Sequence, residues 1–539
     1  MDLVNAPLIL DRIDDTLRSH PDRTAVVDLS TDVPVILTYD ELSHLSNRCA
    51  ARLLEFGVKE GEAVAYQLPS SWEFVVLSLA LWRISAIPCP ILPSLREREV
   101  KFIVESSGSR VLIVPDVFRK FSYSAASQVL KRDVDALQHV FIVDWQSRNS
   151  HSQTLGGLLS DKPLSSQELS LFRPQPSTYA QLLYTSGTTG EPKGVLHTHQ
   201  TLASGLLAHI DTLSLSPADK VWVPSPLAHQ TGFLYGMMLS LCIGTSAIVQ
   251  AIWNVDGARK AIQDYGATFV QAAMPFLADL TKSADPPQGL RLFIATGAAI
   301  PRPLAHVART VLDCNVVGAW GSTESCLVTV GHPDDAPDNL WGTDGQVIGG
   351  MAMRVVDDAG RVLPPGKEGN FQVKTPAMFV SYLHHPEWYN ESFTPDGFFD
   401  TGDLARIDEN GYMRMTGRKK DVINRGGEKI PVVELEDILY QNEALADAAL
   451  VAMPDARLGE RACLYAVVKP QYTAAGSLPS LEDICTFLQQ RGVAKIYWPE
   501  RLEVIPEMPR TASGKIQKVR LREDIREKLQ QEELMAERK

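Results

Sequence analysis

Hydrophobic residues recur at helical spacing along the first part of the chain, and short apolar runs separate these stretches. Thr38 and Glu41 have the spacing of a capping box, which predicts the start of a helix at Thr38. Helical periodicity covers residues 8–18, 38–56, 71–82 and 96–105, whereas residues 24–28, 63–67, 111–114 and 140–143 are typical of short strands. Strands that alternate with helices predict parallel, doubly wound sheets.

The pattern changes twice farther along the chain. Residues 145–176, rich in Ser and Gln, are expected to form a surface connection, and residues 347–380 show the short strands and Gly/Pro turns of a small antiparallel subdomain. From about residue 419 a separate alternation begins, and about 120 residues suffice for an independent α+β domain. We therefore predict an α/β fold with a large domain at 1–418 and a smaller, mobile C-terminal domain at 419–539.

Composition narrows the classes of function. The chain has 539 residues, which is too long for one core, and its net charge is −13, without a cluster of Lys and Arg for nucleic acid. The seven cysteines include no Cys-x-x-Cys pair, which favours a reduced compartment over a disulfide framework or zinc site. No signal peptide and no apolar run long enough to span a membrane is present, so we expect a cytoplasmic protein.

One stretch has the composition of a phosphate-binding loop: Tyr184-Thr-Ser-Gly-Thr-Thr-Gly-Glu-Pro-Lys193-Gly. Glycines let backbone N–H groups turn inward, hydroxyls add donors and Lys193 adds charge. The spacing is not that of a Walker loop, because only two residues separate Gly187 from Gly190 and Gly194 follows the lysine. We expect this loop to join an apolar strand to a helix that begins near Thr201. A solvated Ser/Thr/Gly linker is the alternative.

Three later strings carry further polar chemistry. Val317-Gly-Ala-Trp-Gly-Ser-Thr-Glu324 offers an aromatic ring for a base, a hydroxyl for phosphate and a carboxylate for Mg²⁺. Asp400-Thr-Gly-Asp403 offers a carboxylate for ribose hydroxyls, or an Asp turn. Pro509-Arg-Thr-Ala-Ser-Gly-Lys515 lifts a lysine on a glycine-containing loop, where its charge can offset the charge that develops at a phosphate.

These strings and Thr416-Gly-Arg418-Lys-Lys420, in this order, resemble the motifs of the adenylate-forming superfamily, which comprises acyl-CoA synthetases, amino-acid-activating domains of peptide synthetases and luciferases. The matches span about residues 184–515. The resemblance implies the use of ATP, Mg²⁺ and CoA.

The resemblance also implies a role for each matching residue. Lys515, Thr323, Glu324 and Lys193 would be catalytic, with Glu324 as the Mg²⁺ ligand and Lys420 as the hinge of a swinging small domain. Gly426 and Gly427 would line the CoA tunnel. The ATP- and AMP-binding residues would be Thr185, Ser186, Gly187, Thr188, Thr189, Gly190, Gly297, Ala298, Ala299, Trp320, Gly321, Ser322, Thr323, Asp403, Arg418 and Lys515.

The segment Pro226-Leu-Ala-His229-Gln-Thr-Gly-Phe-Leu-Tyr-Gly236 would border the acyl pocket. It contains no acid, whereas amino-acid-activating relatives place an Asp there for the substrate ammonium, and an unpaired buried ammonium is costly. The expected acyl-binding residues are His229, Gly232, Met274, Ala295 and Gly297; a packed core histidine is the alternative for His229. An uncharged aliphatic, alicyclic or aryl acid fits these residues.

The same segment, with Ala456-Arg-Leu-Gly-Glu-Arg-Ala, looks most similar to short- and medium-chain acyl-CoA synthetases and cyclohexanecarboxylate–CoA ligases. We predict an acid–CoA ligase that forms an acyl adenylate and then a thioester. The alternatives are an enzyme that loads the acyl group onto a separate carrier protein, a luciferase-type oxygenase, and a non-catalytic nucleotide-binding protein. Retention of Lys193, Glu324 and Lys515 disfavours the last of these.

Overall fold

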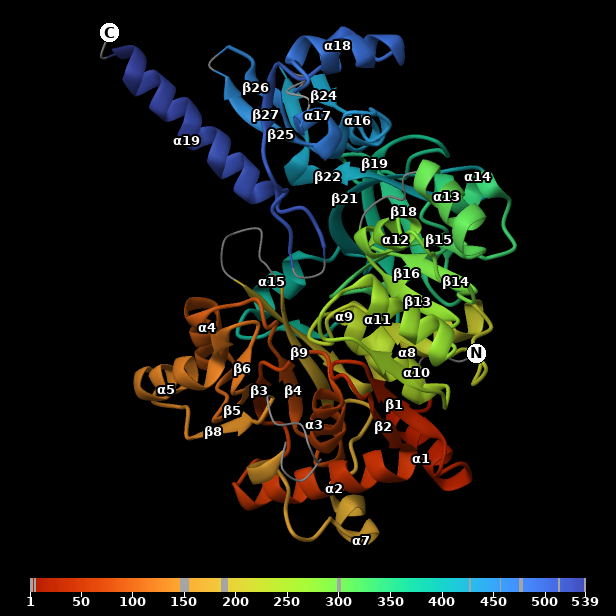
Figure 1. Ribbon diagram of the computed structural model, residues 1–539, viewed down its shortest axis with the longest axis vertical. Coiled ribbons are helices and arrows are strands. Elements are labelled where there is room, and N and C mark those ends of the chain that lie inside the picture. Colours follow the sequence, from red (N-terminus) through yellow and green to blue (C-terminus); the bar gives the residue numbers. More distant parts are fainter. Residues whose placement is uncertain are drawn as a thin grey trace.

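The structure is a computed structural model that describes residues 3, 6–145, 155–185, 192–297, 302–425, 428–455, 457–474, 478–511 and 514–537. Most of the chain forms a large N-terminal α/β domain, and a smaller C-terminal domain lies at one end of it, with helix α19 projecting away (Figure 1). Within the described residues, no helix is both long and apolar enough to cross a bilayer.

The main sheet of the large domain is parallel at its centre and antiparallel at its edges. In the described residues it has nine strands, in the order β17 (Gln346–Val347), β16 (Cys326–Val330), β15 (Asn315–Ser322), β14 (Leu292–Ala295), β13 (Phe269–Ala272), β11 (Val221–Val223), β12 (Ala247–Val249), β1 (Thr24–Asp28) and β2 (Val35–Thr38). All neighbours from β15 to β1 run parallel, so β13, β14 and β15 end at one edge, the usual place for a ligand site.

A second parallel sheet is joined to the first by a buried helix. Its order is β4 (Ile87–Pro90), β3 (Ala63–Tyr66), β5 (Val111–Pro115) and β8 (His139–Val143). Every residue of α3 (Trp72–Arg83) is buried, and the helix contacts both β4 and β1. A helix that is apolar on all sides is stable only when surrounded, which accounts for this central position. The predicted doubly wound fold is confirmed.

Several predicted helices are found within one or two residues of their expected ends. Thr38 accepts from the Glu41 amide (3.2 Å) and the Glu41 carboxylate accepts from the Thr38 amide (2.8 Å), so the predicted capping box opens α2. The helices of the first part are α1 (Ile9–Ser19), α2 (Tyr39–Glu55), α4 (Glu97–Ser107) and α5 (Tyr123–Asp133). The predicted surface connection instead contains a short helix, α7 (Ser166–Leu171), and buries Leu155, Leu158 and Leu159.

The candidate phosphate loop connects two strands rather than a strand and a helix. β9 (Tyr179–Thr185) and β10 (Lys193–Thr198) are antiparallel neighbours, and β20 (Ser381–Tyr382) adds to the other side of β10. The helix that follows, α8 (His199–Thr212), begins at His199, two residues before the expected Thr201. The helix start is thus confirmed to within two residues, but β10 was not expected. Gly194-Val-Leu-His-Thr pairs with β9 before the Thr198 cap starts the helix.

The large domain has further helices after α8. They are α9 (Gln230–Gly232), α10 (Leu239–Cys242), α11 (Val255–Arg259), α12 (Met274–Thr281), α13 (Arg302–Leu312), α14 (Pro337–Gly342) and α15 (Pro386–Glu391), with a π-helical turn at Phe233–Met238. The predicted antiparallel subdomain is confirmed as the sheet β18 (Ala352–Val356), β19 (Gly369–Lys374), β21 (Phe399–Ile407) and β22 (Met413–Arg418).

The small domain has its own sheet and its own cores. The sheet contains β24 (Glu428–Ile430), β23 (Ile423–Arg425), β26 (Gly459–Val468), β25 (Leu445–Asp455) and β27 (Arg501–Val504). Its helices are α16 (Val432–Leu439), α17 (Pro470–Ala474), α18 (Leu481–Gln490) and α19 (Lys518–Glu537). Ile484 and Leu488 of α18 pack on one face of the sheet, whereas Leu521 and Ile525 of α19 join the cluster on the other.

Candidate functional site

Lys193 lies at the end of the candidate phosphate loop, opposite Thr185 in the β9–β10 register. Its ammonium nitrogen lies 4.9 Å from the ring centre of Tyr382 and 4.9 Å from that of Trp388. The predicted loop residues Ser186, Gly187, Thr188, Thr189 and Gly190 lie outside the described residues. The structure therefore fixes both ends of the hairpin from which this loop emerges.

Thr323 and Glu324 form the turn between β15 and β16, beside this hairpin. The Tyr382 hydroxyl donates to Glu324 Oε1 (3.1 Å), and the Phe379 amide donates to the Glu324 carbonyl (2.7 Å). His197 Nε2–H donates to the Thr323 carbonyl at 2.7 Å. Burial lowers the pKa of His197 to about 4, so it is uncharged at neutral pH. These bonds hold the turn against β10 and β20.

Trp320, Asp403 and Arg418 form a second cluster. The Trp320 indole donates to Asp403 Oδ2 (3.0 Å), and Arg418 Nε lies 3.1 Å from Asp403 Oδ1. Asp403 is only 4% exposed, and burial raises its pKa, while the charges of Arg418 and Lys515 and the indole bond act in the opposite direction. Trp320 is itself buried, with its ring packed edge-to-face on Phe371. The predicted stacking residue and ribose residue are thus in direct contact.

Lys515 reaches this site from the small domain. An added Cβ at Gly297, which has a φ of +88°, would lie 3.0 Å from Lys515 Cε. An added Cβ at Gly514 would lie 3.4 Å from Pro275 Cγ. The Lys515 charge also lowers the pKa of His229, after the larger effect of burial. The structure therefore shows the small domain in the orientation that brings Lys515 to the ends of β13 and β14.

The predicted acyl-binding residues surround the same strand ends. The Thr231 amide donates to His229 Nδ1 (3.2 Å), and burial lowers the pKa of His229 to about 4. Gly232 packs so closely that an added Cβ would lie 2.2 Å from the Pro226 carbonyl oxygen. Met274 and Ala295 are both buried, at the start of α12 and the end of β14. The walls are therefore apolar or uncharged.

The other predicted site residues are placed only in part. Gly321 and Ser322 end β15, and Ser322 Oγ accepts from the Ser325 amide (3.1 Å). The backbone of Lys420 lies in the helical turn Lys419–Asp421 between the two domains. Ala298, Ala299, Gly426 and Gly427 lie outside the described residues.

The residues fit Mg²⁺ only together with a phosphate ligand. No group of three His, Cys, Asp or Glu side chains that could hold a metal occurs among the residues described. Magnesium usually keeps several waters and takes one or two carboxylates plus substrate phosphates. A single carboxylate on the turn beside the phosphate loop, Glu324, matches that requirement.

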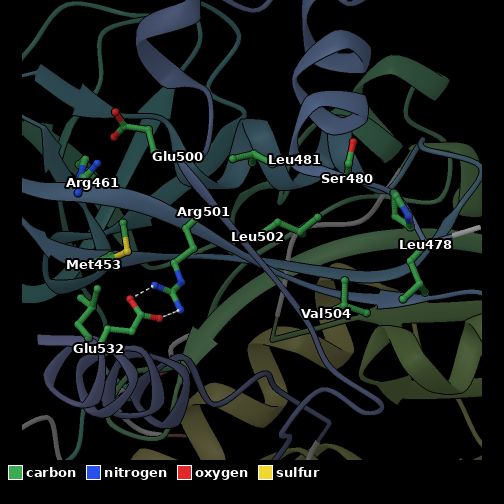
Figure 2. Close-up of a pocket in the computed structure, with 12 residues that line it drawn as sticks. Met453, Arg461, Leu478, Ser480, Leu481, Glu500, Arg501, Leu502, Val504 and Glu532 are labelled. Carbon is green, nitrogen blue, oxygen red and sulfur yellow. Dashed lines mark hydrogen bonds and ion pairs between the residues drawn. The ribbon is translucent and has the colours of Figure 1, made fainter. Parts of the chain in front are cut away.

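A hollow of about 680 Å³ lies elsewhere, on the small domain, and Figure 2 shows its lining. Its charged side chains already have partners: Arg501 pairs with Glu532 and Glu503, Arg461 with Asp455, and Glu500 with Arg425. None of the predicted site residues lines it. It is distinct from the nucleotide site.

Sequence patterns did not indicate three residues that contact the predicted site: His197, Tyr382 and Trp388. His197 lies in β10, a strand that the sequence pattern did not predict. Tyr382 lies in a two-residue strand and Trp388 in a six-residue helix, without a recognisable motif. Both residues lie almost 200 positions after Lys193 in the sequence. No local sequence pattern could therefore have identified their contact with it.

Two family models together match most of the chain. Residues 13–383 match the model described as AMP-binding enzyme, and residues 434–515 match the AMP-binding enzyme C-terminal domain. The chain belongs to the AMP-binding enzyme family. This confirms the predicted adenylate-forming superfamily.

Individual relatives extend over nearly the whole chain. The medium-chain fatty-acid–CoA ligase of Escherichia coli (strain K12) is 35% identical over 521 residues, 96% of this chain and 90% of that protein. The salicyl-AMP ligase / salicyl-S-ArCP synthetase of Mycobacterium tuberculosis is 31% identical over 523 residues, 94% and 88% of the two proteins.

A solved structure also matches at full length. ATP-bound MatB from Rhodopseudomonas palustris superposes with a TM-score of 0.85 at 25% identity, covering 97% of this chain and 99% of that one. The predicted enzyme class, an AMP-forming acid–thiol ligase, and its cofactor set of ATP, Mg²⁺ and CoA are confirmed.

Proposed function

We propose that this enzyme activates an uncharged short- or medium-chain, alicyclic or aryl carboxylic acid and transfers it to CoA. In the first step a carboxylate oxygen attacks the α-phosphorus of ATP, and pyrophosphate leaves. In the second step the CoA sulfur attacks the acyl carbon, AMP leaves, and the thiol proton passes to solvent. The position of Lys515 against Gly297, close enough for its charge to act on His229 and Asp403, carries this proposal.

Each side chain of the site has a proposed part in the first step. Lys515 offsets the negative charge that develops at the α-phosphate, and Lys193 meets the departing pyrophosphate. Thr323 donates its hydroxyl to the α-phosphate, and Glu324 would hold Mg²⁺, which neutralises phosphate charge when bound. Trp320 stacks on adenine, while Asp403 and Arg418 bind the ribose. No nucleophile of the enzyme is required, because the substrate oxygen attacks directly.

The neutral pocket supports the proposed substrate class. His229 is uncharged at neutral pH because burial lowers its pKa to about 4, and the segment 226–236 contains no acid. Nothing in that segment would balance an ammonium group. Met274 and Ala295 add apolar surface. The 35% identical medium-chain fatty-acid–CoA ligase is consistent with this class.

The swing that follows is part of the same proposal. We place the domain boundary after Arg418, with domains at 1–418 and 419–539, and the hinge at Lys420. After the swing, the loop containing Gly426 and Gly427 would line the path of the CoA arm. A cytoplasmic location is consistent with the seven unpaired cysteine thiols.

A carrier protein is the alternative thiol substrate, and one relative favours it: the salicyl-AMP ligase is also named a salicyl-S-ArCP synthetase. An AMP-release screen of small carboxylic acids with ATP, Mg²⁺ and CoA tests the main proposal. The active acids are then compared with CoA and with a phosphopantetheinylated carrier protein as acceptors. Failure of every acid to support exchange of labelled pyrophosphate into ATP would refute the adenylation step.

A further inference from the structure

The ammonium group of Lys193 is flanked by two aromatic rings from outside the phosphate loop. Its nitrogen lies 4.9 Å from the ring centre of Tyr382 in β20 and 4.9 Å from that of Trp388 in α15. The two rings are 6.5 Å apart and inclined at 69°. Within about 6 Å, the negative face of an aromatic ring attracts a cation, so two rings restrict where this ammonium can lie.

Tyr382 also contacts the proposed metal ligand. Its hydroxyl donates to Glu324 Oε1 at 3.1 Å, while its ring contacts Lys193. One side chain therefore joins the cation of the phosphate loop to the carboxylate of the neighbouring turn.

Trp388 is held by contacts within its own short helix. The imidazole ring of His385 stacks on it with 3.6 Å between ring centres and an angle of 5°. His385 Nδ1 in turn lies 2.8 Å from Glu387 Oε1. Pro386 occupies the first turn of this helix, where its fixed φ favours helix formation. The tryptophan ring is thus supported by the His385 ring stacked on it.

We propose that Tyr382 and Trp388 are positioning residues for the phosphate chemistry. The two rings hold the Lys193 ammonium at the base of the phosphate loop, and the Tyr382 hydroxyl sets the distance from that ammonium to Glu324. The polyphosphate and its Mg²⁺ then meet a cation and a carboxylate whose spacing is already fixed. This inference rests on the proposed function and adds two residues to its adenylation step.

Trp388→Ala tests the ring contact. We expect the KM for ATP in pyrophosphate exchange to rise about 2- to 30-fold, the range for losing one cation–π contact. The reaction of preformed acyl-AMP with CoA should keep its rate, because pyrophosphate has already left. Trp388→Phe keeps a ring face and should recover part of the loss. If Trp388→Ala unfolds the protein, Trp388→Leu and Trp388→Phe are compared instead at equal thermal stability.

Phe398→Ala is the matched control. Phe398 carries another cation–π contact, 3.9 Å from the guanidinium carbon of Arg354, and lies outside the nucleotide site. Its removal should leave the KM for ATP unchanged. An equal rise in Phe398→Ala and Trp388→Ala would show a general loss of stability and overturn the inference.

A double-mutant cycle asks whether Trp388 acts through Lys193. In a Lys193→Ala background, Trp388→Ala should have no further effect on ATP binding. Additive losses would overturn the proposed action of Trp388 through Lys193.

Tyr382→Phe tests the contact between Tyr382 and Glu324, since it keeps the ring but removes the hydroxyl. It should raise the Mg²⁺ concentration needed for half-maximal exchange about 5-fold, with ATP affinity nearly unchanged at saturating Mg²⁺.

Calorimetric titration with ATP and Mg²⁺, without any acid, separates this inference from the proposed function. If the wild type binds ATP and the Trp388→Ala and Tyr382→Phe variants bind it equally well at every Mg²⁺ concentration, the positioning role is wrong and the proposed function stands. If the wild type neither binds ATP nor exchanges pyrophosphate, both fall. We expect weaker ATP binding by Trp388→Ala and a shifted Mg²⁺ dependence in Tyr382→Phe.

Discussion

The two lysines of the proposed site are held in opposite ways. Lys193 belongs to a strand of the large domain and lies between two aromatic rings of the same domain. Lys515 belongs to the small domain and reaches the site on the loop that contains Gly514. Lys193 therefore depends on the large domain alone, whereas in the proposed domain swing Lys515 would be present in the site in only one orientation of the domains. Changes at the two positions should affect the two half reactions differently.

The largest effect is expected from Lys515→Ala. Loss of one such electrostatic contact typically lowers a rate roughly 100-fold or more, so pyrophosphate exchange should nearly disappear. Preformed acyl-AMP should still react with CoA, since that step does not need charge at the α-phosphate. Quenched-flow measurement of both half reactions checks this. Equal losses in the two would contradict the separate role of Lys515.

Lys420→Pro is expected to have a smaller effect, and to slow thioester formation rather than adenylation. Proline fixes φ and removes an amide donor, which restricts rotation of the backbone in the turn Lys419–Asp421. Thioester formation should slow on the order of 10-fold, as expected for a gating motion, while pyrophosphate exchange continues. Steady-state thioester formation that matches the wild type would refute the hinge at this position.

Loss of the ion pair between Arg414 and Asp437 should have a smaller effect on the orientation of the two domains. Arg414 Nη2 in β22 lies 2.6 Å from Asp437 Oδ2 in α16, across the proposed hinge. Asp437→Ala should lower pyrophosphate exchange about 2- to 5-fold, the range for a partly exposed pair, without slowing thioester formation from acyl-AMP.

The charge swap Arg414→Asp with Asp437→Arg should restore part of the exchange rate. Glu532→Ala removes an ion pair with Arg501 inside the small domain and is the matched control. If Glu532→Ala lowers exchange as much as Asp437→Ala, the pair across the hinge has no special part in domain orientation.

The last prediction concerns stability rather than rate. All twelve histidines lie before residue 419, in the large domain. Burial lowers the pKa of one of them, His209, to about 3. Above pH 6.5 the His209 ring is neutral in both the folded and the unfolded state. Below pH 6.5, His209 takes up a proton in the unfolded chain but not in the folded domain. Stability is therefore lost as pH falls from about 6.5 toward 3.

His209→Phe should reduce that loss by about 2 kcal/mol between pH 7 and pH 5, the linkage expected for one such group. Urea unfolding at the two pH values measures the difference, and activity at pH 7 should change least of all the variants. An unchanged difference between the two pH values would show that His209 does not set the acid sensitivity.

Local patterns predicted the elements that depend on near neighbours. The capping box of Thr38 and Glu41 and the apolar run of α3 were recognisable because their determinants lie within a few residues. β10 was missed because Gly194 and the polar residues His197 and Thr198 obscure a strand whose pairing with β20 joins residues far apart in the sequence.

The same distinction between local and long-range determinants holds for the candidate site. Motifs indicated Trp320, Asp403 and Lys515, which the structure brings together, although the mutual contacts were not visible in the sequence. The bond between the Trp320 indole and Asp403 joins the two residues that are proposed to contact adenine and ribose. Tyr382 and Trp388 could not be predicted, since their importance depends on which distant side chain they meet.

In the proposed site, Gly297 would link the choice of acid to the rate of its activation. Its φ of +88° disfavours any larger residue, and an added Cβ would crowd the arriving lysine. Redesign of substrate preference at this position would therefore slow adenylation at the same time. Met274 and Ala295 are buried and neither has a positive φ, so they are the better starting points for engineering the enzyme toward new acids.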